Sequence, residues 1–348
     1  HRPLITVQSL SDQLSSQQSC RLTDPTSMVP AKVCAMLRST FLRLMLSSIA
    51  VSPTALRAAA AAACNSAPRK LVLIAGKPSH PPMMHEFRAG TILLEKRLQQ
   101  VANLKVERHE MGWVRDEATF DDAAAVVIFS DGGGGHPAIQ ENRLQLFEKL
   151  IARGVGFGCM HFGVEVPKDR GGAEFQRWIG GHYEHQWSCN PIWDASFESF
   201  PEHPISRGVK PFEIRDEWYF NMRFAEGFDT ALPTTVNNVQ FTPVLAAVPS
   251  TATRNGPYVY PPGPYPHIQQ NAGRKETLLW AVERPDGGKG FGFTGGHFHT
   301  NWQNEDFRRT ILNALCWITG IEVPTHGVDS AAVSDTEIRE NLDPKSKR

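Results

Sequence analysis

The chain has 348 residues, of which 41% are hydrophobic and 21% charged, so it can bury a large core and is not an intrinsically disordered chain. Lysine plus arginine number 36, as do aspartate plus glutamate, and this balance excludes a nucleic-acid binder that relies on net charge. The 13 histidines are candidates for acid–base chemistry or metal binding.

Residues 1–68 form a leader that differs from the rest of the chain and is predicted to be disordered. From Met36, a basic flank, a short apolar run and a series of small residues make up the parts of an export signal. We therefore expect a signal peptide at about residues 36–63, translation from Met36, export to the periplasm or the medium, and Cys64 as the site of a lipid anchor. A disordered Ala-rich leader or an organelle transit peptide is the alternative. The apolar run is too short to span a bilayer, so an integral membrane protein is not expected.

From residue 69 onward, strand patterns alternate with helix patterns. Short apolar or alternating runs predict strands at residues 70–76, 104–109, 123–130 and 154–160. Apolar residues spaced three and four apart predict helices at residues 87–101 and 144–151. Two further strands, at 277–283 and 290–294, precede a helix at 305–319 that ends at Gly320.

This alternation predicts one doubly wound α/β domain over residues 69–324. Its sheet is expected to be mainly parallel, with helices on both faces, as in flavodoxin-like folds. Residues 185–275 are less regular and are predicted to be an insertion in the same domain. Residues 325–348 are predicted to be a polar tail that packs poorly.

Six histidines follow the ends of four predicted strands. They are His80 and His85, His136, His161, and His297 with His299. Ligands of open α/β sheets bind beyond the carboxyl ends of the strands, so we expect these histidines to line one pocket.

The segment Gly158-Cys-Met-His161-Phe-Gly163 resembles the sharp turn between a strand and a helix that exposes a catalytic nucleophile. His161 lies at the apex of this turn. No Gly-x-Ser-x-Gly sequence is present, so a serine hydrolase is not supported.

Five motifs occur in a specific order along the chain. They are Gly154-Val-Gly-Phe-Gly-Cys-Met-His161, Trp178-Ile-Gly-Gly-His182, His203-Pro-Ile-Ser-Arg-Gly208, Asp216-Glu-Trp-Tyr219 and Gly290-Phe-Gly-Phe-Thr-Gly-Gly-His297-Phe-His299. The series resembles the ThuA-like (trehalose utilisation) family, whose fold is similar to that of class I glutamine amidotransferases. The resemblance covers about residues 69–324 and implies a role in carbohydrate metabolism. His161 stands where the amidotransferases carry their cysteine nucleophile, so glutamine hydrolysis is not implied.

The first functional hypothesis is a sugar-processing enzyme, a hydrolase or a related acid–base catalyst acting on a glycoside or keto-sugar. His161 is the expected general acid/base, and Glu217 is its carboxylate partner. The expected substrate-binding residues are His80, His85, His136, His297, His299, Trp218, Tyr219 and Trp302.

A divalent metal, zinc by its ligand chemistry, is an open variant of this hypothesis, held by His161, His297 and His299, with His136 or Glu217 as further candidates. His297 and His299 form a His-x-His pair at the end of a predicted strand, and whether both can chelate one ion depends on the course of the segment that carries them. The second hypothesis is a non-catalytic carbohydrate-binding or scaffold protein that lost the nucleophile. The expected partner in either case is a small carbohydrate and not a nucleic acid, while the oligomeric state is open.

Overall fold

The structure, a computed structural model, describes residues 67–345. The predicted signal peptide and the lipid-anchor residue Cys64 lie outside the described residues and stay predictions. Within residues 67–345, no helix combines the length and apolar character that crossing a membrane requires.

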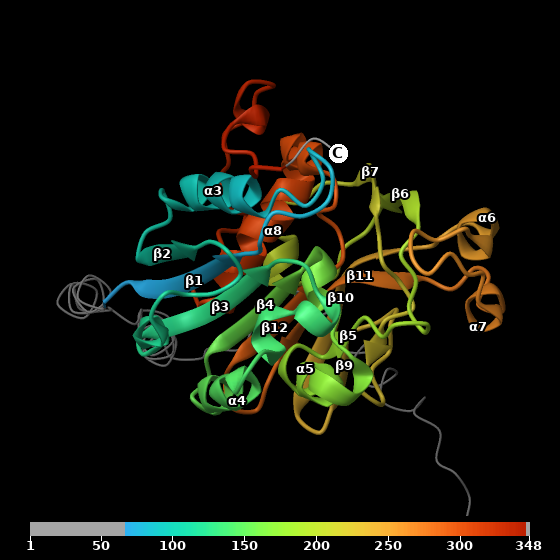
Figure 1. The fold of residues 1–348 in the computed structure, drawn as a ribbon, viewed down its shortest axis with the longest axis horizontal. Helices are drawn as coiled ribbons and strands as arrows, with labels where there is room; N and C mark the ends of the chain where they lie inside the picture. The colour runs from blue at the N-terminus through green and yellow to red at the C-terminus, as the bar shows by residue number, and fades with distance from the viewer. Residues whose placement is uncertain (1–66, 346–348) are drawn as a thin grey trace, which may run out of the picture. The chain divides into compact units, whose positions relative to one another are not determined.

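An eight-stranded sheet lies at the centre, in the order β2-β1-β3-β4-β12-β11-β10-β9 (Figure 1). The first five strands in this order run parallel to one another. They are β2 (Leu104–His109), β1 (Arg69–Ala75), β3 (Ala123–Phe129), β4 (Gly156–Met160) and β12 (Lys289–Phe293). All five were predicted as strands. The apolar runs of β1, β3, β4 and β12 are buried because helices cover both faces of this part of the sheet, whereas β2, at its edge, is only partly buried.

Successive side chains of β1 point into two separate cores. Leu71 and Leu73 belong to one core, with residues of α3 (Phe87–Leu98) and α8 (Glu305–Ile318). Val72 and Ile74 belong to the other, with residues of α4 (Arg143–Ala152) and α5 (Ala173–Trp178). Figure 1 shows α3 and α8 on one side of the sheet and α4 and α5 on the other. The predicted doubly wound α/β architecture is therefore confirmed.

The insertion is more regular than the sequence predicts. It supplies β9 (Thr234–Val236) and β10 (Val239–Ala247), which extend the sheet by antiparallel pairing to β11 (Glu276–Glu283). Pro243 lies inside β10 and disguises this strand in the sequence, and the pairing with β11 is irregular just after it. The other elements are β5 (Gly181–His182) paired with β8 (Arg223–Phe224), β6 (Ile192–Phe197) paired with β7 (Phe212–Glu217), α6 (Thr251–Asn255) and α7 (Pro266–Gln269).

The C-terminal segment packs against α3, contrary to the poor packing expected of a polar tail. Val328, Val333 and Ile338 are buried in the same core as α3 and α8. Arg97 of α3 forms two hydrogen bonds with the carboxylate of Glu337, at 2.7 and 2.8 Å. A few apolar residues and several ion pairs therefore anchor a segment whose overall composition is polar.

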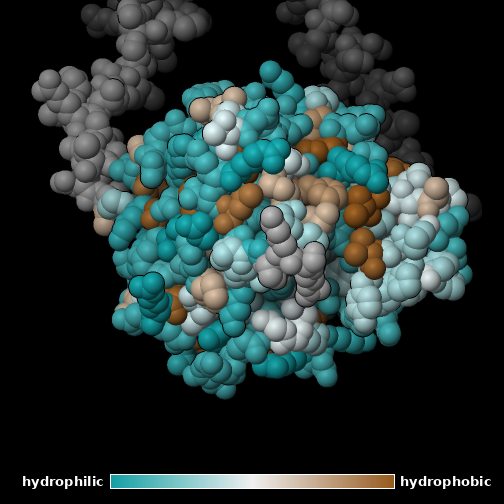
Figure 2. Space-filling view, turned by 45° about the horizontal axis from the view of Figure 1, so that its top comes forward, coloured by the Kyte–Doolittle hydropathy of each residue, from teal (hydrophilic) through white to brown (hydrophobic). Residues whose placement is uncertain are grey.

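The surface is consistent with this division between core and solvent. The face shown in Figure 2 is largely hydrophilic, and its hydrophobic residues form small, separate patches. Patches of this kind are ordinary for a folded domain and do not by themselves indicate a docking surface.

Candidate functional site

The turn after β4 presents His161 to the carboxyl edge of the sheet. His161 has a φ of 53°, in the left-handed region that residues other than glycine rarely adopt. Its Nδ1–H donates to the carbonyl of Thr294 at 2.9 Å, which leaves the lone pair of Nε2 facing the site. The sharp turn predicted from the sequence is present, with an imidazole at its apex.

His85 reaches the same point from the loop after β1. Its Nδ1 lies 2.8 Å from Oδ1 of Asp131, which follows β3, and its Nε2 lies 3.0 Å from Nε2 of His161. The carboxylate of Asp131 accepts the Nδ1–H of His85, so the Nε2 of this ring also carries a lone pair. Two bare imidazole nitrogens at this separation repel unless a proton or another cation lies between them.

Glu217 and His297 complete the cluster. Glu217 is the last residue of β7, and its Oε2 lies 2.7 Å from Nδ1 of His297 and 3.5 Å from Nε2 of His161. The side-chain amide of Asn190 donates to the other oxygen, Oε1, at 2.9 Å. His297 follows β12, and its Nδ1 lies 2.9 Å from Nε2 of His85.

A buried carboxylate fixes the loop that carries His297. Asp216 is fully buried, and its two oxygens accept hydrogen bonds from the backbone amides of Gly296, at 2.7 Å, and His297, at 3.0 Å. Asp216 and Glu217 are neighbours on β7, so one strand positions the loop and supplies the carboxylate that faces it.

Burial and ion pairing control the charge of the cluster. Burial by itself raises the pKa of Glu217, but hydrogen bonds and positive charge from His161 and His297 outweigh it and bring this pKa to about 2. Burial by itself lowers the pKa of His161, but Glu217 and Asp216 outweigh it and raise this pKa. Burial, reinforced by the neighbouring imidazoles, holds the pKa of His85 well below its usual value. Glu217 is therefore ionised, while His85 is neutral and able to donate a lone pair.

The cluster has the composition of a metal site. One donor atom from each of His85, His161, Glu217 and His297 lies within 4.8 Å of every other, and all four residues are buried. Ligand atoms of a tetrahedral zinc site lie about 3.3 Å apart, since the metal–ligand distances are about 2.0–2.1 Å. Five separations between these donor atoms run from 2.7 to 3.5 Å, and they include 3.3 Å between Nδ1 of His297 and Nε2 of His161. The buried His/Glu group can therefore hold a metal ion, and outer acceptors orient two of its imidazoles as metal ligands require.

A family model described as trehalose utilisation matches residues 74–318, which include all four of these residues. The chain belongs to the ThuA family. A crystal structure of a ThuA-like protein from Bacteroides uniformis has a TM-score of 0.50 and 14% identity, over 73% of this chain and 92% of that chain. Another, from Parabacteroides merdae, has a TM-score of 0.49 and 17% identity, over 79% of this chain and all of the other, 100%. The first likeness supports the fold alone, and no curated protein matches the chain.

Two more of the predicted residues of this ThuA-family chain lie beside the cluster. The ring of His80 stacks on that of His85 with centroids 3.6 Å apart, and its side chain is 38% exposed, so it marks the side open to solvent. The hydroxyl of Tyr219 lies 3.3 Å from Nε2 of His161, and its ring is buried. The structure thus brings together His80, His85, His161, Glu217, Tyr219 and His297.

The other predicted residues lie apart from these six. The Nδ1 of His136 accepts a hydrogen bond from the backbone amide of Ala138, and its ring lies against Phe175 in the core. Trp218 and Trp302 are fully buried and pack on Phe307.

His299 is also outside the metal-binding group, which contains His85 in its place. The chain continues beyond His297 into a short 3₁₀ turn that starts at His299, and the Nδ1 of this buried ring has no partner among the described residues. Only the first histidine of the His-x-His pair therefore reaches the cluster.

Three supporting residues were not assigned a role from the sequence: Asp131, Asn190 and Asp216. Asp131 was detectable, because it immediately follows a predicted strand and precedes the glycine run at the edge where ligands bind. Asn190 carried no such signal, because it reaches Glu217 from a distant part of the insertion.

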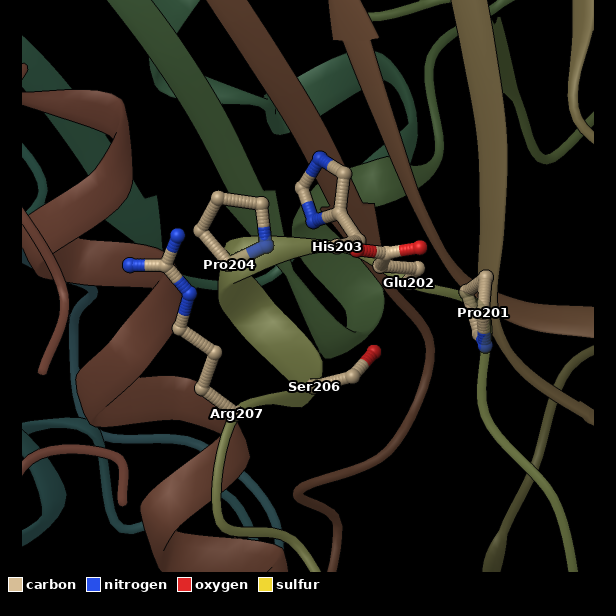
Figure 3. Close-up of a pocket in the computed structure, with 6 residues that line it drawn as sticks. All are labelled: Pro201, Glu202, His203, Pro204, Ser206 and Arg207. Atoms are coloured by element: carbon tan, nitrogen blue, oxygen red, sulfur yellow. The ribbon is translucent and has the colours of Figure 1, made fainter. Parts of the chain in front are cut away.

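A separate pocket of about 410 Å³ lies away from the cluster (Figure 3). Pro201, Glu202, His203, Pro204, Ser206 and Arg207 line it. The ring centroid of His203 lies 5.0 Å from that of Trp317, which is in the last turn of α8. The backbone carbonyl of Trp317 accepts a hydrogen bond from Nζ of Lys289, at the start of β12. The pocket is thus near the amino end of β12, whereas His297 follows its carboxyl end.

Proposed function

We propose that this protein is a metal-dependent enzyme of carbohydrate metabolism that performs acid–base chemistry on a glycoside or keto-sugar. The observation that carries the proposal is the convergence of Nε2 of His85, Nε2 of His161, Nδ1 of His297 and Oε2 of Glu217. Three imidazoles and one carboxylate suit zinc better than magnesium or calcium, which prefer oxygen ligands.

Different residues at the cluster have different proposed roles. His85, His161, His297 and Glu217 would hold the ion, which when bound would polarise a substrate oxygen or lower the pKa of a water molecule. Asp131 and the Thr294 carbonyl keep two imidazoles in the tautomer that binds a cation. The hydroxyl of Tyr219 is close enough to His161 to orient a substrate oxygen or a water.

The open side of the cluster suits a polyhydroxyl ligand. His80 and Asp131 are both partly exposed there and offer a donor and an acceptor to sugar hydroxyls. The family description, trehalose utilisation, supports a carbohydrate as the substrate class.

A metal-stabilised, non-catalytic carbohydrate-binding protein is the second candidate. Four protein ligands are typical of structural zinc sites, whereas catalytic sites generally keep a position for water. Both candidates predict stoichiometric metal, so only turnover of a substrate distinguishes the enzyme from the binding protein.

The test measures metal content and turnover on the same samples. The full chain is purified without chelators and analysed for zinc by mass spectrometry, and its action on trehalose and on keto-trehalose is followed by the release of monosaccharide. We expect one zinc per chain and turnover that is lost in His161→Ala, while the exposed control His326→Ala retains both. Absence of stoichiometric metal would overturn the metal site. Stoichiometric metal without turnover would overturn the enzyme and favour the non-catalytic carbohydrate-binding protein.

A further inference from the structure

The proposed reaction needs a proton donor that is not itself a metal ligand. If the four clustered residues hold a cation, their lone pairs are occupied, and neither His161 nor Glu217 is free to protonate a departing oxygen. A second titratable group beside the cluster would meet this need.

Glu165 lies against the glycine run that follows Asp131, the residue whose carboxylate contacts His85. It follows the 3₁₀ turn His161–Val164, and its backbone is fixed on two sides. Its amide donates to the carbonyl of Phe162 at 3.0 Å, and its carbonyl accepts from the amide of Gly133 at 2.9 Å. It also pairs with Tyr183 through an isolated β-bridge. The residue is therefore held between the glycine loop after β3 and the segment that leads into the insertion.

The carboxyl group of Glu165 has no hydrogen bond or ion pair among the described residues, although the residue is half-buried. Burial, with the charge of Glu217 adding to it, raises the pKa of Glu165 to about 7. The carboxyl group is thus partly protonated near neutral pH, as a proton donor requires.

Tyr183, the β-bridge partner of Glu165, lies next to Tyr219 at the edge of the cluster. Tyr183 is 1% exposed, and its hydroxyl has no hydrogen-bond partner among residues 67–345. The Tyr183 ring lies 5.2 Å from that of Tyr219, whose hydroxyl approaches His161. A buried hydroxyl without a partner is costly, and a bound ligand that reached it would provide one.

The glycine run leaves this side of Glu165 open. A side-chain carbon at Gly133 would lie 3.6 Å from Oε1 of Glu165, and one at Gly134 or Gly135 would meet nothing within 4 Å. Gly132 cannot carry a side chain, because its first carbon would lie 2.1 Å from the carbonyl oxygen of Phe162. The run therefore permits a close backbone approach beside Glu165 and adds no side chain that would cover it.

We propose that Glu165 is a catalytic carboxyl group, which protonates the leaving oxygen of a glycoside bound beside the four clustered residues. The inference rests on the proposed function. The O–H bond of Glu165 breaks as its proton moves to the glycosidic oxygen, and the electron pair of the breaking C–O bond stays on that oxygen. The oxygen of a water molecule bonds to the carbon, and a proton from that water restores the Glu165 carboxyl. One water is consumed and two hydroxyl compounds form.

The test compares two probes that differ in their need for an acid. Trehalose has a sugar alcohol as its leaving group, whereas 4-nitrophenyl α-glucoside releases a phenolate that leaves without a proton. We expect Glu165→Gln to lower kcat/KM for trehalose by about 100-fold or more, as is typical of a lost general acid, and to lower it less than tenfold for the nitrophenyl probe. Zinc content should stay at the wild-type value. The matched control is Glu148→Gln, an exposed carboxylate on α4, which should change neither.

The outcomes separate the two proposals. Equal loss on both probes, or no loss, with wild-type zinc content would overturn the role of Glu165 alone. A wild-type protein that holds zinc and cleaves neither probe would overturn the proposed hydrolytic function and the proton-donor role with it. Loss of zinc in Glu165→Gln would show that the residue supports the metal site, and would also overturn its assignment as the acid.

Discussion

Asp131→Asn tests the claim that the cluster is oriented to bind a metal. Asp131 does not belong to the group of four donors, so the substitution leaves them all in place. It removes the negative charge that accepts the Nδ1–H of His85 at 2.8 Å. We expect the affinity for Zn²⁺ to fall, because this carboxylate fixes the tautomer and ring orientation of His85 and raises its basicity.

Loss of such an outer carboxylate weakens metal binding by about 10- to 100-fold, or about 1.4 to 2.7 kcal/mol. The Asp131 side chain is 37% exposed, so solvent screens its charge, and the lower end of this range applies. Asp131→Ala, which removes the hydrogen bond as well as the charge, should have the larger effect. The other oriented imidazole, His161, donates to a backbone carbonyl, so only the His85 side can be tested by substitution.

The measurement is a competition titration of Zn²⁺ against a chelating dye, with His85→Ala as the reference for loss of a ligand. Asp194→Asn is the matched control, since Asp194 lies on β6 in an exposed ion pair with Arg215. A zinc affinity within twofold of the wild type for both Asp131 variants, together with a clear loss for His85→Ala, would refute the orientation argument.

Two further predictions concern stability. Burial lowers the pKa of His136 to about 3, against about 6.5 in the unfolded chain, so only the unfolded state gains this proton as the pH falls. The free energy of unfolding should therefore fall below pH 6.5, by at most about 1.4 kcal/mol per pH unit for this residue, until the pH reaches about 3. His136→Asn keeps an acceptor for the Ala138 amide and should flatten that slope in urea unfolding between pH 4.5 and 6.5. An unchanged slope would contradict the assignment. Hydrogen bonds from Arg97, aided by Lys96, outweigh burial and lower the pKa of Glu337 to about 2, so its stabilisation is present above pH 4.5 and is lost as the pH falls through 2. Glu337→Gln should cost about 1 kcal/mol at pH 7 and speed amide exchange in the C-terminal segment, whereas equal exchange in both proteins would show that the apolar contacts suffice.

The parallel half of the sheet was predictable because its residues leave few alternatives. Five apolar or alternating runs occur along the chain together with two regularly spaced helix patterns, and each of the five runs forms a strand in the structure. Glycine at the carboxyl ends of β1 and β12 and the position of His161 after β4 also marked the edge where side chains would gather. The prediction of a shared site follows from that rule, and the structure places His85, His161 and His297 together.

The rule locates the end of a strand but does not set the direction of the side chains that follow it. His136 lies in the loop after β3 and His161 in the turn directly after β4, yet the Nδ1 of His136 accepts from the amide of Ala138 and its ring is buried against Phe175. The difference depends on local dihedral angles, such as the φ of 53° at His161, and on neighbouring side chains far away in the sequence. Similarly, the packing of the C-terminal segment depends on a few buried residues, and its average composition did not reveal them.

The origin of Glu217 shows what the insertion contributes to the candidate site. Three imidazoles come from loops of the parallel sheet, but Glu217 comes from β7, which belongs to the insertion. Asp216 bonds the backbone beside His297, and Asn190 holds Glu217, so the insertion contributes both a ligand and the hydrogen bonds that align it. A parallel sheet alone would present three neutral donors, whose affinity for a cation is limited by the absence of a balancing charge. Docking of the insertion onto the carboxyl edge is therefore the step that completes the site, and a bound cation would in turn hold the two parts of the fold together.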